Sequence, residues 1–336
     1  RQVLESARER LAAILGATPA EVIFTSGGTE SINLALRGLC TGAPGAILAP
    51  QGEHPATEQT LAALAATGWQ LHRLPLDPLG LLDLTRLGEV TWSSVRLVTL
   101  LLAHNETGVV QDVAPLAALC REHRIPWHLD AVQAVGKIPV HFQRLGATAL
   151  SLAAHKFHGP RGIGALLLRD GTRLSPLLRG GHQERDRRAG TECGALAAGM
   201  ARALELWQAD HTALTARLVE LRDRLHRGLV AACPPVQLIG HPTQRLPNTL
   251  NLAFPGCDGE ALLVALDLDG VCASLGGTCS SGAMEPAPIL QAMQVPAAWQ
   301  RSCLRLSLGL GNSPAEVDRA VEIISRTVAR LRRRET

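Results

Sequence analysis

The feature of this sequence that most constrains its fold is an alternation of short apolar runs with stretches of helical periodicity. The apolar runs lie at 21–25, 45–49, 94–102, 126–130, 148–152 and 165–168. Continuous apolar runs are typical of strands that are buried on both faces, and intervening helices are typical of parallel connections. We therefore predict an α/β fold with a mostly parallel sheet and helices on both of its faces.

The pattern changes near residue 208. Beyond it lie a long amphipathic helix at 214–229, an apolar run at 249–253, a helix at 260–268, an alternating run at 301–308 and a final helix from Pro314. This mixture is typical of an α+β unit. We expect a large domain over residues 1–208 and a smaller C-terminal domain over residues 209–336.

Composition narrows the function classes. The 336 residues, 46% of them hydrophobic, are enough to bury a core in two domains, and a formal charge of +3 gives no strong attraction to nucleic acid. The sequence shows no secretory signal and no apolar run of membrane length, and its eight cysteines have no C-x-x-C spacing or tight Cys/His cluster. We expect a reduced, cytoplasmic setting, no membrane, no direct nucleic-acid binding and no structural metal site.

Lys156 stands just after an apolar run, and a Gly-rich turn at 159–164 follows it. An amine at a strand end reacts with aldehydes when a rigid turn holds it and apolar neighbours desolvate it. The setting suits a Schiff-base lysine. A solvated lysine is the ordinary alternative, so the interpretation depends on partners elsewhere in the chain.

An acid closes another apolar run. Asp130 ends the run at 126–130, and Gln133 follows at the expected start of a helix. Because ligands of open α/β sheets bind at the carboxyl ends of strands, both side chains are predicted to share a pocket with Lys156. Pyridoxal 5'-phosphate requires such a set, since a lysine binds its aldehyde and an acid keeps its pyridine nitrogen protonated.

A strand, a Gly-rich turn and a helix are predicted over residues 22–34. Backbone N–H groups at the helix start, together with the hydroxyl of Thr29, suit a phosphate group. The segment has neither a Walker loop nor a dinucleotide fingerprint. An ordinary tight turn is the alternative.

Eight segments, in order, carry a wider resemblance: 24–31, 53–56, 104–108, 130–133, 155–156, 183–191, 277–282 and 304–309. In these segments the chain resembles the class V pyridoxal-phosphate enzymes and, among them, the cysteine desulfurases of the nitrogen-fixation and iron–sulfur assembly branch. The resemblance implies the aspartate aminotransferase-like fold of pyridoxal-phosphate-dependent transferases. It also implies a homodimer that acts on L-cysteine.

The resemblance assigns roles to single residues. Asp130 would pair with the ring nitrogen, His54 would stack on the ring and shuttle protons, and Thr191 would reach the phosphate of the neighbouring subunit. The full cofactor-binding set that it implies is Gly28, Thr29, His54, Asn105, Asp130, Gln133, His155, Lys156 and Thr191. The residues alone leave ordinary alternatives open: a loop histidine for His54, a turn cap for Asn105, a solvated helix residue for Gln133 and a helix N-cap for Thr191.

Two further residues concern the substrate. Cys279 has no apolar neighbour within three residues on either side and lies among glycines, so we expect a mobile, exposed thiol, whereas most of the other cysteines are expected to be structural. Arg305 lies in an alternating run opposite the leucines, and its fork would bind the substrate carboxylate beside Asn105. A solvated arginine on an exposed sheet face is the alternative.

The implied chemistry is a sulfur transfer. The amino group of L-cysteine displaces Lys156, and Lys156 or His54 removes the Cα proton. The thiolate of Cys279 then attacks the substrate sulfur, which leaves L-alanine and a persulfide on Cys279. The sulfur would pass to an acceptor protein, such as an iron–sulfur scaffold or a carrier for tRNA thiolation. A selenocysteine lyase, another class V reaction and a non-catalytic scaffold homologue are the alternatives.

The sequence departs from the family pattern at two places. The resemblance begins inside the family's first helix, so we expect the N-terminal segment of the family to be missing. Ala153 stands where the family usually has a serine whose hydroxyl helps to hold the phosphate. One lost hydrogen bond to a charged group costs about 1.5 to 3 kcal/mol, which predicts weaker cofactor binding.

Overall fold

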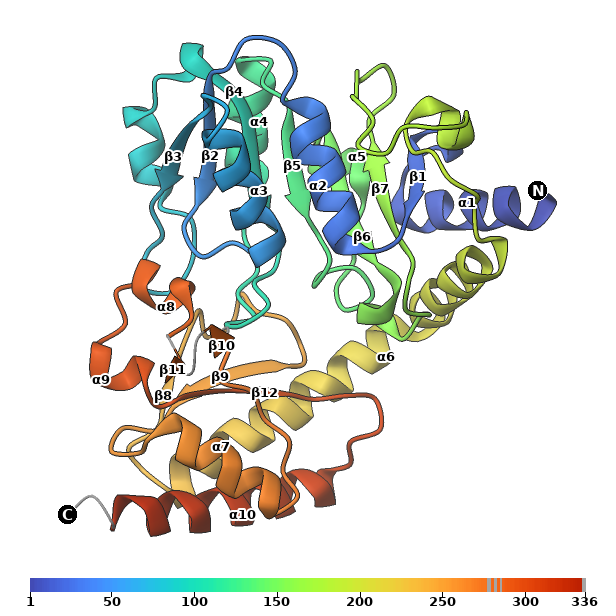
Figure 1. Ribbon diagram of the computed structural model, residues 1–336. Coiled ribbons are helices and arrows are strands. Elements are labelled where there is room, and N and C mark those ends of the chain that lie inside the picture. Colours follow the sequence, from blue (N-terminus) through green and yellow to red (C-terminus); the bar gives the residue numbers. More distant parts are fainter. Residues whose placement is uncertain (277–278, 281–282, 285, 334–336) are drawn as a thin grey trace. The chain divides into compact units, whose positions relative to one another are not determined.

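The structure is a computed structural model that describes residues 1–276, 279–280, 283–284 and 286–333, the pairs 279–280 and 283–284 by their backbone alone. Two compact units can be distinguished (Figure 1). Unit 1 comprises Arg1–Pro75, Leu82–Ala103 and Gln111–His211, and unit 2 comprises Leu76–Leu81, His104–Val110 and Thr212–Thr336. The short segments at 76–81 and 104–110 thus belong with the C-terminal part of the chain.

Unit 1 contains a seven-stranded sheet with the order β1-β7-β6-β5-β4-β2-β3. Its strands are β1 (Val22–Thr25), β2 (Ala46–Pro50), β3 (Gln70–Leu74), β4 (Val95–Leu101), β5 (Trp127–Asp130), β6 (Ala149–Ala153) and β7 (Gly164–Leu168). Neighbouring strands from β3 to β6 pair in parallel, and β7 runs antiparallel to both β6 and β1. The predicted α/β class and mostly parallel sheet are confirmed.

The helices of unit 1 connect these strands and cover the sheet. They are α1 (Gln2–Leu15), α2 (Gly28–Leu39), α3 (Pro55–Ala65), α4 (Ala114–Glu122) and α5 (Phe142–Leu145). Figure 1 shows α2 and α3 in front of the sheet. Every residue of β1, β2, β5, β6 and β7 is buried, which requires cover on both faces.

Unit 2 is built on a three-stranded antiparallel sheet with the order β12-β9-β8, formed by β8 (Gln237–Leu238), β9 (Thr249–Ala253) and β12 (Cys303–Ser307). Its helices include α7 (Gly259–Leu268), α8 (Pro288–Ala292), α9 (Ala297–Gln300) and α10 (Pro314–Arg332). Side chains of β9, β12, α7 and α10 join in one apolar cluster that includes Phe254, Leu262 and Val328. The expected α+β pattern is therefore present.

Three local expectations differ from the structure. Strand β3 was not predicted, because its exposed residues lack an apolar pattern. Gln133 was expected to start a helix, but hydrogen-bonded turns follow β5 instead, with the N–H groups of Ala134 and Val135 bonded to the carbonyl of Ala131. The long helix is longer than expected, since α6 (Gly194–Ala232) continues through a break at Asp210, where φ is −133°.

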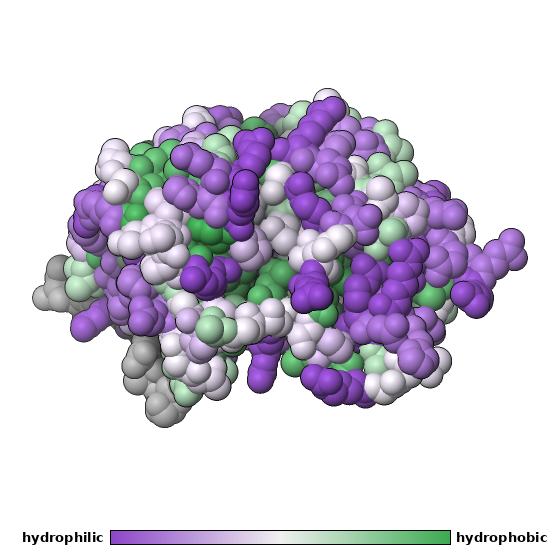
Figure 2. All heavy atoms as spheres, turned by 90° about the horizontal axis from the view of Figure 1, so that it is seen from above, coloured by the Kyte–Doolittle hydropathy of each residue, from purple (hydrophilic) through white to green (hydrophobic). Residues whose placement is uncertain are grey.

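One face of the molecule is largely polar. Figure 2, which looks from above the view of Figure 1, shows hydrophilic side chains over most of this face, with smaller hydrophobic patches between them. Throughout the described ranges, no helix has both the length and the hydropathy that crossing a membrane requires.

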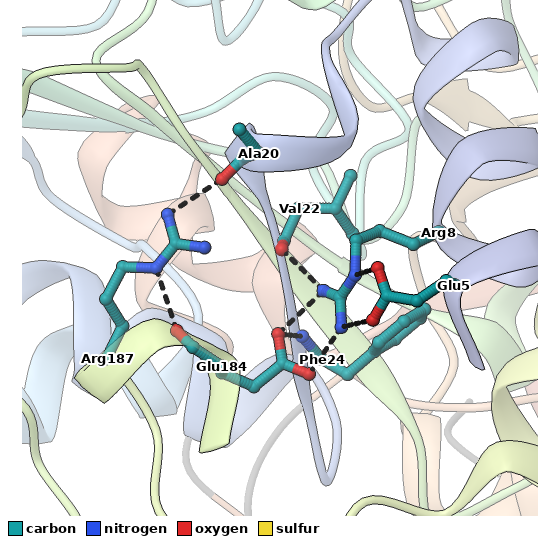
Figure 3. A network of polar contacts seen from close by, with 7 residues as sticks. All are labelled: Glu5, Arg8, Ala20, Val22, Phe24, Glu184 and Arg187. Carbon is teal, nitrogen blue, oxygen red and sulfur yellow. Dashed lines mark hydrogen bonds and ion pairs between the residues drawn. The ribbon is translucent and has the colours of Figure 1, made fainter. Parts of the chain in front are cut away.

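A buried ion pair ties the first helix to the start of the sheet (Figure 3). The guanidinium of Arg8 lies 2.7 Å and 2.9 Å from the two carboxylate oxygens of Glu184, and the side chains are 7% and 1% exposed. Arg8 also donates to the carbonyl of Val22 at 2.8 Å, and Glu184 accepts the N–H of Phe24 at 3.2 Å. This pair thereby fixes β1 against the segment at 183–186.

We expect Arg8→Ala to lower the free energy of unfolding by about 3 to 5 kcal/mol, because it leaves the Glu184 carboxylate buried without its partner. Urea unfolding followed by tryptophan fluorescence measures the change. The control is Arg86→Ala, which removes the ion pair between Arg86 and Glu89. The side chains of this pair are 54% and 61% exposed, so the variant should change stability little. Equal losses in the two variants would contradict the expectation.

Candidate functional site

Lys156 lies in a 3-10 turn, Ala154–Phe157, directly after β6. The turn is closed by two backbone hydrogen bonds, from Ala154 N–H to the carbonyl of Ile163 at 3.2 Å and from Gly159 N–H to the carbonyl of Ala154 at 2.9 Å. Phe157, 2% exposed, anchors it in the core. The half-buried Lys156 is therefore held at the carboxyl end of β6.

Asp130 is the last residue of β5, the strand that pairs with β6, and it is 1% exposed. Burial raises the pKa of its carboxyl to about 6, against the lowering effects of the Val132 N–H and the positive charge of Lys156. That N–H is bonded to Oδ1 of Asp130 at 3.0 Å. A buried acid that a nearby cation keeps close to ionisation is suited to hold a protonated ring nitrogen.

His54 is the N-cap residue of α3, after the loop that leaves β2. Its Nδ1 accepts the N–H of Ala56 at 3.1 Å, which places the proton of the neutral ring on Nε2. Burial lowers the pKa of His54, and the charge of Lys156 lowers it further. The ring is therefore neutral at pH 7, and its Nε2–H is left to donate a proton.

The three side chains form one electrostatic group. Lys156 influences both Asp130 and His54, although the three residues follow different strands. They converge because the carboxyl ends of parallel strands lie on one edge of the sheet. The structure thus brings together the three residues on which the sequence argument depended most.

The expected phosphate-binding residues lie at the same edge. Helix α2 begins at Gly28 with Gly27 as its N-cap. A Cβ added to Gly28 would lie 2.8 Å from Cγ2 of Val132 and 3.6 Å from Cβ of Ala153, so this turn packs against the residues that follow β5 and end β6. Only glycine permits this approach, and the side chains of Thr29 and His155 remain exposed.

Two other predicted cofactor residues of unit 1 lie in irregular segments. Gln133 is half-buried, and its Oε1 accepts a hydrogen bond from Lys137. Thr191 is exposed and precedes α6, which begins at Gly194. The alternative interpretation of Thr191 as a helix N-cap is therefore wrong, since the residue directly before α6 is Cys193.

The predicted substrate residues Arg305 and Asn105 both belong to unit 2. Arg305 lies on β12, with its side chain 27% exposed, and its Nη1 donates to the carbonyl of Asn105 at 3.2 Å. The same Nη1 forms an ion pair with Oε1 of Glu106 at 2.8 Å. The alternative of a solvated arginine is wrong, because the Arg305 guanidinium is engaged by the segment at 104–110.

Cys279 lies in β10 (Cys279–Ser280), which pairs antiparallel with β11 (Ala283–Met284). The side chain of Cys279 is not among those that the structure describes. The predicted exposure and mobility of its thiol therefore stay predictions. Among the other cysteines, Cys120, Cys233, Cys257 and Cys303 are buried, as expected for structural residues. Burial raises the pKa of Cys303 to about 12, which keeps this thiol protonated.

The burial and raised pKa of the acid next to His54 were not predicted from the sequence. Glu53 is 6% exposed; its Oε1 accepts the N–H of Leu101 at 3.0 Å, and its Oε2 has no partner in the described part of the chain. Burial raises its pKa to about 8, and the negative charge of Asp130 adds to the effect. A glutamate three residues after the end of a buried strand was the available signal.

A buried histidine two residues before Asp130 on β5 was also not predicted from the sequence. His128 is fully buried on β5 and links neighbouring strands, since Nδ1 lies 2.9 Å from the hydroxyl of Thr99 and Nε2 lies 2.8 Å from that of Ser151. Burial lowers its pKa to about 3, so the ring is neutral. The only signal in the sequence was its position two residues before Asp130.

Glu53 should make stability depend on pH in a defined direction. Its pKa is about 8 in the folded chain and near 4.5 when exposed, so the folded state binds more protons between these values and loses stability as pH rises. Glu53→Gln lacks this loss. Without cofactor, the unfolding free energy of the variant relative to the parent should rise between about pH 5 and pH 8.

Urea unfolding at several pH values measures this difference. The exposed residue Glu9 offers the matched control, Glu9→Gln. If the Glu53→Gln difference stays flat over that pH range, or if Glu9→Gln shows the same slope, Glu53 is not a neutral acid in the folded protein.

Comparisons with known proteins identify the family of this chain. Residues 1–320 match the sequence profile of the family described as "Aminotransferase class-V". A cysteine desulfurase of Enterobacter agglomerans is 42% identical over 335 residues, and one of Nostoc sp. is 40% identical over 333 residues. These alignments cover 99% and 98% of this chain and 83% of each relative.

A solved structure gives the same result for the fold. A chain titled "NifS-like protein" superimposes with a TM-score of 0.91 at 32% identity, over 98% of this chain and 88% of that one. The likeness thus extends over nearly the whole chain. This chain belongs to the class V aminotransferase family and, within it, to the cysteine desulfurases.

Proposed function

We propose that this protein is a pyridoxal-phosphate-dependent cysteine desulfurase that converts L-cysteine to L-alanine and holds the sulfur as a persulfide on Cys279. The observation that carries the proposal is the grouping of Lys156 with Asp130 and His54 at the carboxyl edge of the sheet. The similarity to cysteine desulfurases over nearly the whole chain supports it further.

The residues of unit 1 fit this cofactor. Lys156 supplies an amine for its aldehyde, Asp130 a buried acid for its ring nitrogen, and the start of α2 an array of N–H groups for its phosphate. The close approach at Gly28 leaves no room for a side chain between this turn and Val132. In the described ranges, no group of three or more His, Cys, Asp or Glu residues could hold a metal ion instead.

When bound, pyridoxal phosphate supplies an electron sink that accepts the electrons released at the substrate Cα. The chain's own residues bind, orient and move protons around it. Asp130 would keep the ring nitrogen of the bound cofactor protonated, and His54, neutral with its proton on Nε2, would lie against the ring. The base for the Cα proton is Lys156, because Nδ1 of His54 is engaged by the Ala56 N–H and Nε2 already carries the proton, so that neutral His54 can only donate.

Arg305 and Cys279 act on the substrate. The guanidinium of Arg305 holds the α-carboxylate, and Asn105 lies beside it. The thiolate of Cys279 attacks the sulfur of the substrate, so that an S–S bond forms, the Cβ–S bond breaks and Cβ takes up a proton. The products are L-alanine and a Cys279 persulfide, and the reaction balances without an external oxidant.

We further propose that the working unit is a homodimer, in which Thr191 reaches the phosphate bound by the partner subunit. The exposed position of Thr191 in unit 1 is compatible with this role. The persulfide would then pass to a sulfur-acceptor protein in the cytoplasm, for iron–sulfur cluster assembly or tRNA thiolation.

The first test adds L-cysteine and a reductant to the purified protein and assays sulfide and alanine, together with visible absorption. We expect a yellow protein that releases both products in equal amounts. Cys279→Ala should keep the yellow colour but lose sulfide release, because the thiol acts after the cofactor is bound, whereas Lys156→Ala should lose the covalent attachment. A colourless, inactive parent protein would support the scaffold alternative instead.

Ala153→Ser should strengthen cofactor binding. A serine hydroxyl at the end of β6 restores one hydrogen bond to a charged group, which corresponds to a dissociation constant about tenfold to a hundredfold lower. Equilibrium dialysis of pyridoxal phosphate measures it. Ala149→Ser, the same exchange at the start of β6, is the control. An unchanged dissociation constant for Ala153→Ser would show that this position does not face the phosphate.

A further inference from the structure

Glu106 has an environment that the proposed chemistry does not explain. Its side chain is 10% exposed, and Oε1 accepts hydrogen bonds from Nη1 of Arg305 at 2.8 Å and from Nδ2 of Asn105 at 2.7 Å. Its other oxygen, Oε2, is buried without a partner among the described residues. One carboxylate therefore contacts both residues that we assign to the substrate.

The backbone of Glu106 is fixed as firmly as its side chain. Its N–H donates to Nδ1 of His104 at 3.1 Å, and its carbonyl accepts from Nδ2 of Asn251 at 3.3 Å. Asn251 lies on β9 directly opposite Arg305 of β12. Two neighbouring residues of the unit 2 sheet thus hold the segment at 104–110. Asn251 binds the backbone of Glu106, and Arg305 binds its carboxylate.

The way Arg305 is held leaves one of its edges available. Both of the hydrogen bonds that its side chain makes to described residues come from Nη1, to Glu106 and to the carbonyl of Asn105. A guanidinium has five N–H donors in a planar fork, and a carboxylate binds two of them side by side. With Nη1 fixed, the plane of the fork is set, and the edge formed by Nε and Nη2 remains for an incoming carboxylate.

Glu106 also lies against the segment that leads to Cys279. A Cβ added to Gly276 would lie 2.2 Å from Oε2 of Glu106, so a side chain at position 276 would displace this carboxylate. Ser274, two residues earlier, exchanges both backbone hydrogen bonds with Arg305, at 3.1 Å and 2.7 Å. The contact explains why a glycine with φ of +69° stands here.

We propose that Glu106 is a positioning residue that orients the Arg305 fork for the substrate carboxylate. The inference rests on the proposed function for the identity of the substrate, but the geometry applies to any α-amino acid that Arg305 binds. Because orientation of Arg305 serves substrate and transition state alike, its loss should raise KM and leave kcat nearly unchanged.

The experiment measures binding of L-alanine to the holoprotein by equilibrium dialysis, and KM and kcat for L-cysteine. Glu106→Ala should raise the dissociation constant of L-alanine and the KM by about tenfold, since a charge-assisted hydrogen bond that orients the fork is lost. Glu106→Gln keeps an acceptor oxygen for Nη1 and should show a smaller rise. Asp318→Asn, which breaks the exposed Arg224–Asp318 ion pair of unit 2, is the control and should change neither constant.

A double-mutant cycle separates positioning from general structural support. The effect of Glu106→Ala on L-alanine binding should disappear when Arg305 is already replaced by alanine, because the two residues act as one unit. The same additional loss in both backgrounds, or no loss in either, would overturn the proposal. If Glu106→Ala fails to fold, the same cycle with Glu106→Gln decides the question.

The readouts also distinguish this inference from the proposed function. A parent protein that binds L-alanine through Arg305 but releases no sulfide from L-cysteine would refute the desulfurase activity and leave the role of Glu106 intact. A parent protein whose L-alanine binding does not depend on Arg305 would overturn the inference, even if sulfide is released.

Discussion

The central constraint on unit 1 is that its parallel sheet is buried on both faces. Five of its strands have no exposed residue, so polar side chains within them must be paired, as His128 is with two hydroxyl groups. Charged groups are placed where strands end, because there the chain leaves the core. Asp130 and Lys156 share one edge of the sheet for this reason, and the chemistry that we propose depends on that edge.

Electrostatics at this edge is shaped by burial more than by the number of charges. Glu53 and Asp130 are both buried acids, with pKa values raised to about 8 and about 6. The two pKa values differ because the positive charge of Lys156 lowers that of Asp130, whereas Glu53 has one carboxylate oxygen without a partner among the described residues. One acid is thus held neutral and the other stays close to ionisation, as the role proposed for Asp130 toward a ring nitrogen requires.

Much of the fold could be predicted because its signals are local. The run at 148–152 corresponds to β6 (Ala149–Ala153), and the run at 165–168 falls within β7 (Gly164–Leu168). Strand β3 could not be predicted, because an exposed edge strand needs no apolar pattern. The hydrogen-bonded turns after Asp130 were mistaken for the start of a helix, because the residues after Asp130 are compatible with either structure.

The sequence by itself determined the fold class and the family, and it supplied the candidate reactive residues, because strand-end polar groups and motif order are written along the chain. Tertiary structure alone decided which groups share an environment. It joined Glu106 to Arg305, which lie 199 positions apart, and it joined Arg8 to Glu184, which lie 176 apart. Burial decided which acids stay neutral, since desolvation depends on everything packed around a group and no sequence pattern records it.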